Sequence, residues 1–275
     1  MKKIQTGLLF FLSLFSVNIY AQTTTQATEQ LVVPLSNPGK SYSLKVGLMN
    51  GSIKVTGSTG KDIVIDVTPD ATAKKEPIED QGNGMKKINP KTGYDITATE
   101  NNNEINVSSN SFMRYLSLSL KIPQGVKLTL STVNGGDIIV DNIKGELEIN
   151  NVNGGVKLTN ISGSVSATTV NGDVITTFKE IEPSAPMAFS TLNGKVDVSV
   201  PATAKLNLKM KSDRGEIFTD FDVEIQKTDE KVTKTSGSGM YQLKKDDWVL
   251  GKINSGGPEV MMKNMQGNIY LRKSK

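Results

Sequence analysis

One short unit recurs along the middle of this chain at a nearly constant step. It consists of an apolar residue, a variable residue and a glycine, and successive glycines lie 10, 9, 9 and 9 residues apart. The five regular copies are Val133–Gly135, Ile143–Gly145, Val152–Gly154, Ile161–Gly163 and Val170–Gly172. Looser copies end at Gly51, Gly194 and Gly267. A fixed short period predicts an architecture in which one structural unit is repeated.

Apolar and polar residues alternate after each glycine. Leu147 and Ile149 follow Gly145, for example, with Glu146 and Glu148 between them. A period of two is typical of a strand with one buried and one solvated face. No window of comparable length shows the 3.6-residue period of a helix, so the sequence predicts an all-β fold. We expect the apolar positions to share one dry interior, as represented by Leu147, Val156, Val165 and Val174.

Two all-β architectures fit this spacing. Asn-Gly between alternating strands is a strong hairpin signal and would give an antiparallel β-sandwich or meander. However, Lys144-Gly145 and Ser162-Gly163 are poor hairpin pairs and yet lie in the same frame. Each glycine also has an apolar residue two positions before it, which would suit an inward-pointing corner of stacked rungs. We therefore favour a β-solenoid-like stack with glycine turns every 9–10 residues, with the antiparallel arrangement as the alternative.

The N-terminal residues predict export. Lys2 and Lys3 precede a short apolar run, Leu8–Val17, and Ala21 stands at a plausible cleavage point. This is the layout of a secretory signal peptide at 1–21, with a run too short to cross a membrane, and no later segment is long enough either. We expect a flexible lead-in at 22–40 and one β-repeat domain at 41–275, with a polar insertion at 70–93. The location would be periplasmic or at the cell surface.

Composition excludes several kinds of chemistry. The chain has no cysteine and no histidine. It therefore lacks disulfides, thiol nucleophiles, Ser-His-Asp triads and histidine metal sites. Without the predicted signal peptide, 30 basic residues face 28 acidic ones, since Lys2 and Lys3 account for two of the 32. A nearly neutral chain gives no electrostatic reason to expect nucleic acid as a partner.

The remaining candidates for catalysis are outward carboxylates. A carbohydrate-active enzyme built on a β-helix could use paired carboxylates, or a basic residue that abstracts a proton. The candidates are Glu146 with Glu148, Asp137 with Asp141, and Asp173. Outward acids that alternate with apolar residues are also what any half-solvated strand shows. We therefore keep this enzyme as the alternative and predict no catalytic, cofactor-binding or metal-binding residues.

Three weaker motifs have structural interpretations. Ser58–Lys61 matches the Ser-x-x-Lys pattern of acyl enzymes, but it is flanked by glycine and predicts a turn, not the helix start that this chemistry needs. Aspartate and asparagine cluster at the corners without matching a calcium-binding loop. Trp248 is the only tryptophan; packing in the core or at an end is expected over stacking on a sugar.

The segment Leu128–Gly135 resembles the repeat of a widespread bacterial family of uncharacterised exported domains, catalogued as "putative adhesins". The segments Ser255–Val260 and Met265–Leu271 fit it as well, and the resemblance covers about 41–67 and 115–273. It implies a β-solenoid-like stack and transfers no functional residues. We expect an exported, non-catalytic binding or scaffold module, whose partner would be an envelope polymer, a glycan or a surface protein.

Overall fold

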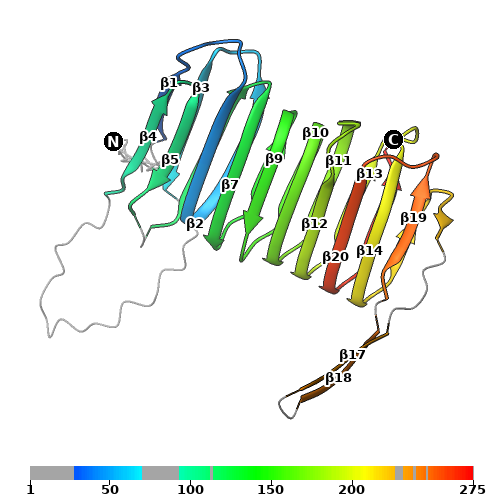
Figure 1. Ribbon diagram of the computed structural model, residues 1–275. Coiled ribbons are helices and arrows are strands. Elements are labelled where there is room, and N and C mark those ends of the chain that lie inside the picture. The colour runs from blue at the N-terminus through cyan, green and yellow to red at the C-terminus, as the bar shows by residue number, and fades with distance from the viewer. Residues whose placement is uncertain are drawn as a thin grey trace, which may run out of the picture.

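The computed structural model describes residues 28–69, 93–111, 114–226, 232–237, 240–245 and 247–274. These residues form strands and connecting loops without any helix, as the alternation predicted, and the stack of strands is elongated (Figure 1). Within the described ranges there is accordingly no helix that could cross a bilayer. The predicted signal peptide and residues 70–92 of the predicted insertion lie outside the described residues.

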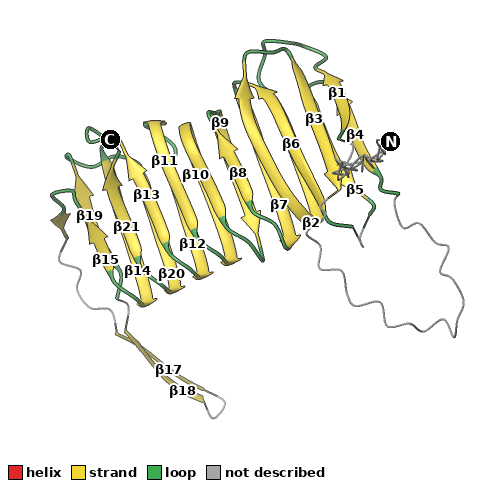
Figure 2. Cartoon of the chain, turned by 180° about the vertical axis from the view of Figure 1, so that it is seen from behind, coloured by secondary structure: helices red, strands yellow, loops and turns green. Residues whose placement is uncertain are grey.

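The strands of the main sheet form two walls that enclose the core (Figures 1 and 2). Wall 1 comprises β4 (Ile96–Asn101), β5 (Glu104–Ser109), the first half of β2 (Tyr42–Ser58), β7 (Val126–Asn134), β9 (Lys144–Asn151), the second half of β10 (Val156–Asn171), β12 (Met187–Asn193), β20 (Glu259–Gln266), β14 (Leu206–Arg214), β19 (Val249–Ile253) and β16 (Glu224–Ile225). Wall 2 comprises β1 (Glu29–Pro34), β3 (Asp62–Pro69), β6 (Leu116–Pro123), the second half of β2, β8 (Ile138–Asp141), the first half of β10, β11 (Val174–Ile181), β13 (Val196–Val200), β21 (Ile269–Lys273) and β15 (Ile217–Thr219). Separately, β17 (Val232–Gly237) and β18 (Met240–Lys245) pair with each other.

Neighbouring strands in the middle of both walls are parallel. In wall 1, Leu128 of β7 lies beside Leu147 of β9, which in turn lies beside Val165 of β10. Among the described strands, antiparallel pairs occur only towards the ends of the stack, as between β3 and β6 or between β14 and β19, and in the separate β17–β18 pair. The antiparallel sandwich is therefore wrong for the centre of the molecule, which is stacked like a β-solenoid.

The core is the dry space between the two walls. Leu147, Val156, Val165 and Val174 are all buried, with at most 2% of their surface exposed. The predicted interior positions are therefore confirmed. The core also contains the aromatic pair Phe178 and Phe189, whose rings meet edge to face at 6.2 Å. Apolar burial and continuous strand pairing stabilise this fold without any cysteine.

A rung here means one strand of wall 1, one strand of wall 2 and the corner between them. The order of rungs in space departs from their order in sequence at two places. The rung of β2 is inserted between β5–β6 and β7–β8. The rung of β20 and β21 is inserted between β12–β13 and β14–β15. Segments distant in sequence thus complete the stack at both ends.

The first corner, where wall 1 turns into wall 2, contains a column of glycines. They are Gly51, Gly136, Gly154, Gly172, Gly194, Gly267 and Gly215 in spatial order. A Cβ atom on Gly136 would lie 1.9 Å from the carbonyl oxygen of Gly51, and one on Gly194 would lie 2.1 Å from that of Gly172. Adjacent rungs approach so closely here that no side chain fits. By contrast, Gly145 and Gly163 belong to the opposite corner and lie within strands β9 and β10, where a glycine turn was expected.

The prediction of an apolar inward residue at each corner is wrong for the first corner. Val133, Val152 and Val170 are only half-buried, and Leu192 is 43% exposed. The residue before each of them points inward, and it is polar: Thr132, Asn151, Thr169 and Thr191. Their side chains donate hydrogen bonds to glycine carbonyls of the preceding rung. The backbone is dry at this corner, so its carbonyl groups need a donor more than they need an apolar neighbour.

The prediction of a flexible lead-in at 22–40 is also wrong in part. Glu29–Pro34 form β1, which pairs antiparallel with β3 along Asp62–Val67. Val33 and Leu35 are buried in the core. The Thr- and Gln-rich composition of this segment hid the two apolar residues that fix it to the end of wall 2.

Candidate binding groove at the second corner

The second corner, where wall 2 turns back into wall 1, is tight in the regular rungs and wide in one of them. In the tight copies Asn142 and Asn160 adopt left-handed backbone angles, with φ of 55° and 57°. Asparagine tolerates this conformation, so it can turn the chain in few residues. Ile143 and Ile161 follow and are buried. After β11 the corner is instead a longer loop containing Glu182, Pro183 and Pro186, which leaves a hollow beside the tight corners.

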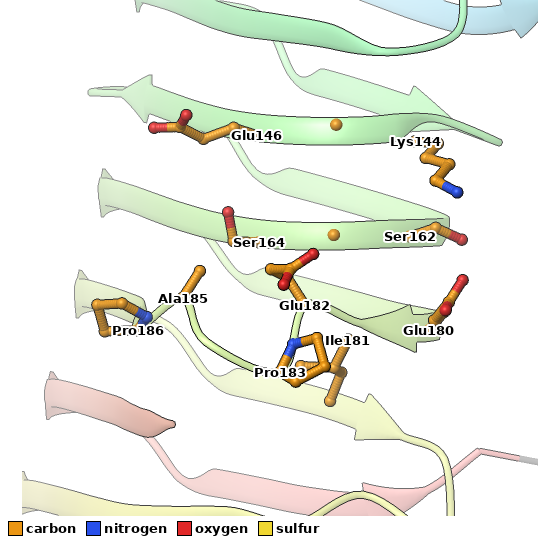
Figure 3. A pocket seen from close by; sticks show the side chains of 12 residues that line it. Lys144, Glu146, Ser162, Ser164, Glu180, Ile181, Glu182, Pro183, Ala185 and Pro186 are labelled. Carbon is orange, nitrogen blue, oxygen red and sulfur yellow. The ribbon is translucent and has the colours of Figure 1, made fainter. Parts of the chain in front are cut away.

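The hollow is a cavity of about 600 Å³ that spans three rungs. Figure 3 shows Glu146 and Ser164 at one end, Lys144, Ser162 and Glu180 at the other, and Glu182 between them. The side chains come from β9, β10, β11 and the loop that follows β11. The backbone amide of Glu182 donates a 3.0 Å hydrogen bond to the carbonyl of Gly163, which fixes the loop to the neighbouring rung.

A second cavity of about 420 Å³ continues along the same corner. It shares Glu180, Ile181 and Pro183 with the first cavity, so the two cavities adjoin; together they are called the corner groove below. Its far end is bounded by the loop after β13 and by Gly256 and Gly257. The corner groove therefore extends along the second corner from β9 to the loop after β13.

An unusual turn shapes the far end of the corner groove. Asn254, Ser255 and Gly256 are consecutive left-handed residues, with φ of 48°, 74° and 78°. The conformation is costly for residues that carry a Cβ atom. It is held by hydrogen bonds from Asn254 Nδ2 to the carbonyls of Ala202 (2.9 Å) and Ala204 (2.8 Å). These bonds tie the entry of the inserted β20 rung to the loop after β13.

The charges in the corner groove balance. Three carboxylates line it, on Glu146, Glu180 and Glu182, together with three ammonium groups, on Lys144, Lys179 and Lys205. Hydroxyl groups of Ser162, Ser164 and Thr203 lie among them, and prolines supply apolar surface. Such a lining offers hydrogen bonds of both polarities and favours neither anions nor cations.

Of the carboxylates that the sequence offered for catalysis, Glu146 alone lines the corner groove. It lies 3.3 Å from Lys127 Nζ, and Glu148 is exposed two residues further along β9. The aspartates take part in corner hydrogen bonds: Asp137 accepts from the amide of Gly155 (2.7 Å), Asp173 from that of Lys195 (2.9 Å) and Asp141 from Asn160 Nδ2 (2.9 Å). No group of three or more acidic residues in the described chain could hold a metal ion.

The other two motifs also find structural roles. Ser58 Oγ accepts a 3.3 Å hydrogen bond from the amide of Gly60, so Ser58–Lys61 is a turn between β2 and β3. Trp248 is half-buried, and Lys209 Nζ lies 5.0 Å from its ring centroid. It packs on the outside of wall 1 near the end of the stack, outside the buried core.

Sequence reasoning missed Glu180, Glu182 and the loop that opens the corner groove. The available signal was the interruption of the period, since the glycine after Gly172 is Gly194, and Pro183 and Pro186 lie between them. An irregular repeat in an otherwise regular stack marks a place where the surface is not flat.

Comparison with known proteins finds one matching family model and two similar solved structures. The family described as Toastrack DUF4097 matches residues 119–247. A crystal structure of a "putative cell adhesion protein" from Clostridium sporogenes is 13% identical, covers 90% of this chain and 100% of that chain, and has a TM-score of 0.43. A "putative adhesin" from Bacteroides fragilis is 8% identical, with 90% and 97% coverage and a TM-score of 0.29. No curated protein has significant sequence similarity to the chain.

Proposed function

We propose that this protein is an exported, non-catalytic binding module that holds an extended, hydroxyl-rich polymer such as an envelope glycan in the corner groove. The observation that carries the proposal is that the two cavities adjoin along the second corner and share Glu180, Ile181 and Pro183. An open groove that crosses a stiff stack suits a chain-like ligand better than a small molecule, which would favour an enclosed pocket.

The lining of the corner groove supports the ligand class. Balanced carboxylates and ammonium groups, with three hydroxyl groups between them, can donate to and accept from sugar hydroxyls. Neighbouring strands repeat about every 4.8 Å, so contacts recur along the groove at a fixed spacing. Several weak contacts to one polymer then add up through effective concentration.

Filling the groove tests the proposal. Ser164→Trp places a large side chain in the first cavity, and Ser166→Trp places it two residues further along the same strand, on the exposed outer face of wall 1. We expect Ser164→Trp to weaken binding to immobilised neutral, acidic and amino-sugar polysaccharides at least tenfold, and Ser166→Trp to change it little. Equal affinity of both variants and the wild type, with unchanged circular dichroism, would refute a ligand in this groove.

One observation favours a second candidate, a glycan-processing enzyme. Glu146, Glu180 and Glu182 line the same cavity, and glycoside hydrolysis needs two carboxyl groups on either side of the bond. The test is the release of reducing ends from the same polysaccharides. Turnover that is abolished by Glu146→Gln, Glu180→Gln or Glu182→Gln would establish catalysis, whereas binding without turnover supports the binding module.

A further inference from the structure

An aromatic pair lies on the outer surface of wall 2, away from the corner groove. Phe218 of β15 and Tyr270 of β21 are in register on adjacent parallel strands. Their rings are stacked, with centroids 5.3 Å apart and an interplanar angle of 14°. Phe218 is 45% exposed. The outward residues at the same level of the other rungs, including Lys54, Ile139, Lys157 and Ile175, carry no aromatic ring.

Charged residues contact Tyr270 on the side that faces away from Phe218. Asp197 of β13 is in register with Tyr270, across from Phe218. The guanidinium group of Arg272 lies 4.6 Å from the Tyr270 ring and donates two hydrogen bonds to Asp197, at 2.8 and 3.4 Å. The hydrogen bond with Asp197 raises the pKa of Arg272, so the guanidinium group stays charged. Tyr270 is thus held between Phe218 and Arg272, and little side-chain freedom is left to lose on binding.

The pair borders a cavity of about 300 Å³. Phe218, Thr219, Asp220, Tyr270, Leu271 and Arg272 line it. The cavity is at the small end of the range for ligand sites, large enough for one ring of a larger molecule. Asp220 Oδ1 accepts a 2.8 Å hydrogen bond from the amide of Lys273, which places its carboxylate at the rim. The cavity therefore combines an aromatic surface with a fixed acceptor and a fixed donor.

Packing of the fold does not account for an aromatic pair at this position. The core already contains the pair Phe178 and Phe189, which are at most 1% exposed. Full burial of a Phe side chain stabilises a fold by about 1.5–3 kcal/mol. Phe218 is 45% exposed, so its burial contributes only part of this free energy. An exposed stacked pair beside an ordered Arg–Asp hydrogen bond has the composition of a binding surface.

The charges at the cavity indicate an uncharged ligand. The two charged residues that line the cavity, Asp220 and Arg272, carry opposite charges, and Arg272 is also paired with Asp197. A charged ligand would find no uncompensated partner here. Pyranose rings meet both requirements, because their C–H groups carry partial positive charge toward an aromatic face and their hydroxyl groups pair with Asp and Arg at the rim.

We propose that the exposed ring of Phe218, held by stacking on Tyr270, forms with Asp220 and Arg272 at the rim a stacking site for one pyranose ring of a neutral glycan. The site is separate from the corner groove and does not depend on a ligand there. An aromatic peptide or a nucleobase would use the same ring surface, and these ligands belong among the outcomes of the test.

The experiment compares variants on an array of neutral, uronic-acid and amino-sugar glycans, followed by titration of the best neutral oligosaccharide. Phe218→Ala and Tyr270→Ala should each lower affinity for the neutral glycan about tenfold or more, and Phe218→Trp should retain it. Leu192→Ala removes an equally exposed apolar side chain on wall 1 and should change nothing. Thermal melts of all variants establish that they fold.

The outcomes separate this proposal from the groove. If Phe218→Ala loses affinity for the neutral glycan and Ser164→Trp keeps it, the stacking site alone is supported. If Ser164→Trp loses affinity and Phe218→Ala keeps it, only the corner groove is supported and the stacking site is overturned. The proposal also fails if the wild type binds no neutral glycan at millimolar concentration. The proposal is also overturned if the protein binds only acidic glycans. It is overturned as well if the protein binds no glycan but does bind an aromatic peptide or a nucleotide.

Discussion

At the scale of single residues, the first corner is held by inward polar side chains. The side chains of Thr132, Asn151, Thr169, Thr191, Asn264 and Ser212 donate to glycine carbonyls of six successive rungs, at 2.8–3.2 Å. Outside them, the side chains of Asn134, Asn153, Asn171 and Asn193 bond to one another from rung to rung. The corner column thus supplies hydrogen bonds where the close approach of the rungs keeps water away.

The hydrogen bond of Thr169 can be tested by an isosteric change. Thr169→Val keeps the shape and leaves the carbonyl of Gly154 without its 2.8 Å donor. We expect a loss of about 1–2 kcal/mol in the free energy of unfolding, measured by urea denaturation. Thr168→Val, on the exposed face of the same strand, is the control and should cost less than about 0.5 kcal/mol. Equal effects of the two variants would contradict the role of the inward column.

The glycine column predicts a steric effect separate from backbone preference. Gly136 does not have a positive φ, but a Cβ atom there would lie 1.9 Å from the carbonyl oxygen of Gly51. Gly136→Ala should destabilise the fold by more than about 2 kcal/mol, because two rungs must separate. Gly93→Ala is the matched control, since its Cβ would have no neighbour within 4 Å. Thermal melts of both variants provide the measurement, and similar melting temperatures would refute the close approach.

Glu100 makes the end of the stack sensitive to acid. Its carboxylate accepts hydrogen bonds from the amide of Asn103 (2.9 Å) and from the hydroxyl of Ser36 (2.9 Å), and the first of these is the main cause that lowers the pKa of Glu100. A pKa lowered by folding contributes stability above the unfolded value, and this is lost as pH falls through the folded value. The urea midpoint of Glu100→Gln should therefore be lower than that of the wild type near neutral pH, and the two midpoints should converge in acid. A difference between the midpoints that does not depend on pH would contradict the role of the Glu100 carboxylate.

At the scale of elements, the two inserted rungs decide how the stack is completed. β20 pairs in parallel with β12 on one side and with β14 on the other, although the chain passes through β14 and β19 before it reaches β20. Likewise, β2 lies between β5 and β7. Such pairings join segments far apart in sequence, which raises the entropy cost of forming them and is typical of slow folding.

Removing the inserted C-terminal rung should release the strands beyond it. A chain that ends at Gly257 lacks β20 and β21, so β14 and β15 lose their parallel partners. We expect the amides of Leu206–Arg214 to exchange with solvent rapidly, while those of β7 and β9 in the same molecule stay protected and serve as the internal control. Hydrogen exchange read by mass spectrometry measures both. Retained protection of β14 would show that its pairing with β19 is sufficient.

At the scale of the whole molecule, the stack is a one-dimensional array with modified ends. Antiparallel strands close both ends of wall 1 and the β1 end of wall 2. Such ends reduce the tendency of open strand edges to pair with other chains. The core runs through the stack as one cluster of buried residues, so the rungs share a continuous interior.

This arrangement predicts graded local stability. A central rung such as that of β9 has neighbours on both sides, whereas β1 and β16 each have one pairing partner within the described part of the chain. We expect the amides of β9 and the second half of β10 to exchange only on global unfolding, and those of β1 and β16 by local opening. Hydrogen exchange at increasing urea concentration distinguishes the two. A single exchange free energy for all strands would contradict the array description.

Local patterns predicted much of the core and little of the surface. Alternation placed Leu147, Val156, Val165 and Val174 inside because side chains of a strand point to opposite faces whatever the strand pairs with. The same patterns gave Glu146 an outward position, but not its neighbours in the corner groove. Glu180 and Glu182 join it from β11 and the loop that follows, and Phe218 meets Tyr270 only because a distant rung is inserted beside it.

The sequence by itself therefore determined that the chain is all-β, which residues of the repeated central strands are dry, and that disulfide and histidine chemistry is excluded. These properties depend on residue type and on spacing over a few positions. Only the tertiary structure decided that the rungs stack in parallel, that β2 and β20–β21 are inserted out of order, and that polar side chains fill the first corner. Those properties depend on which strands become neighbours in space, and a two-residue period is compatible with many neighbours.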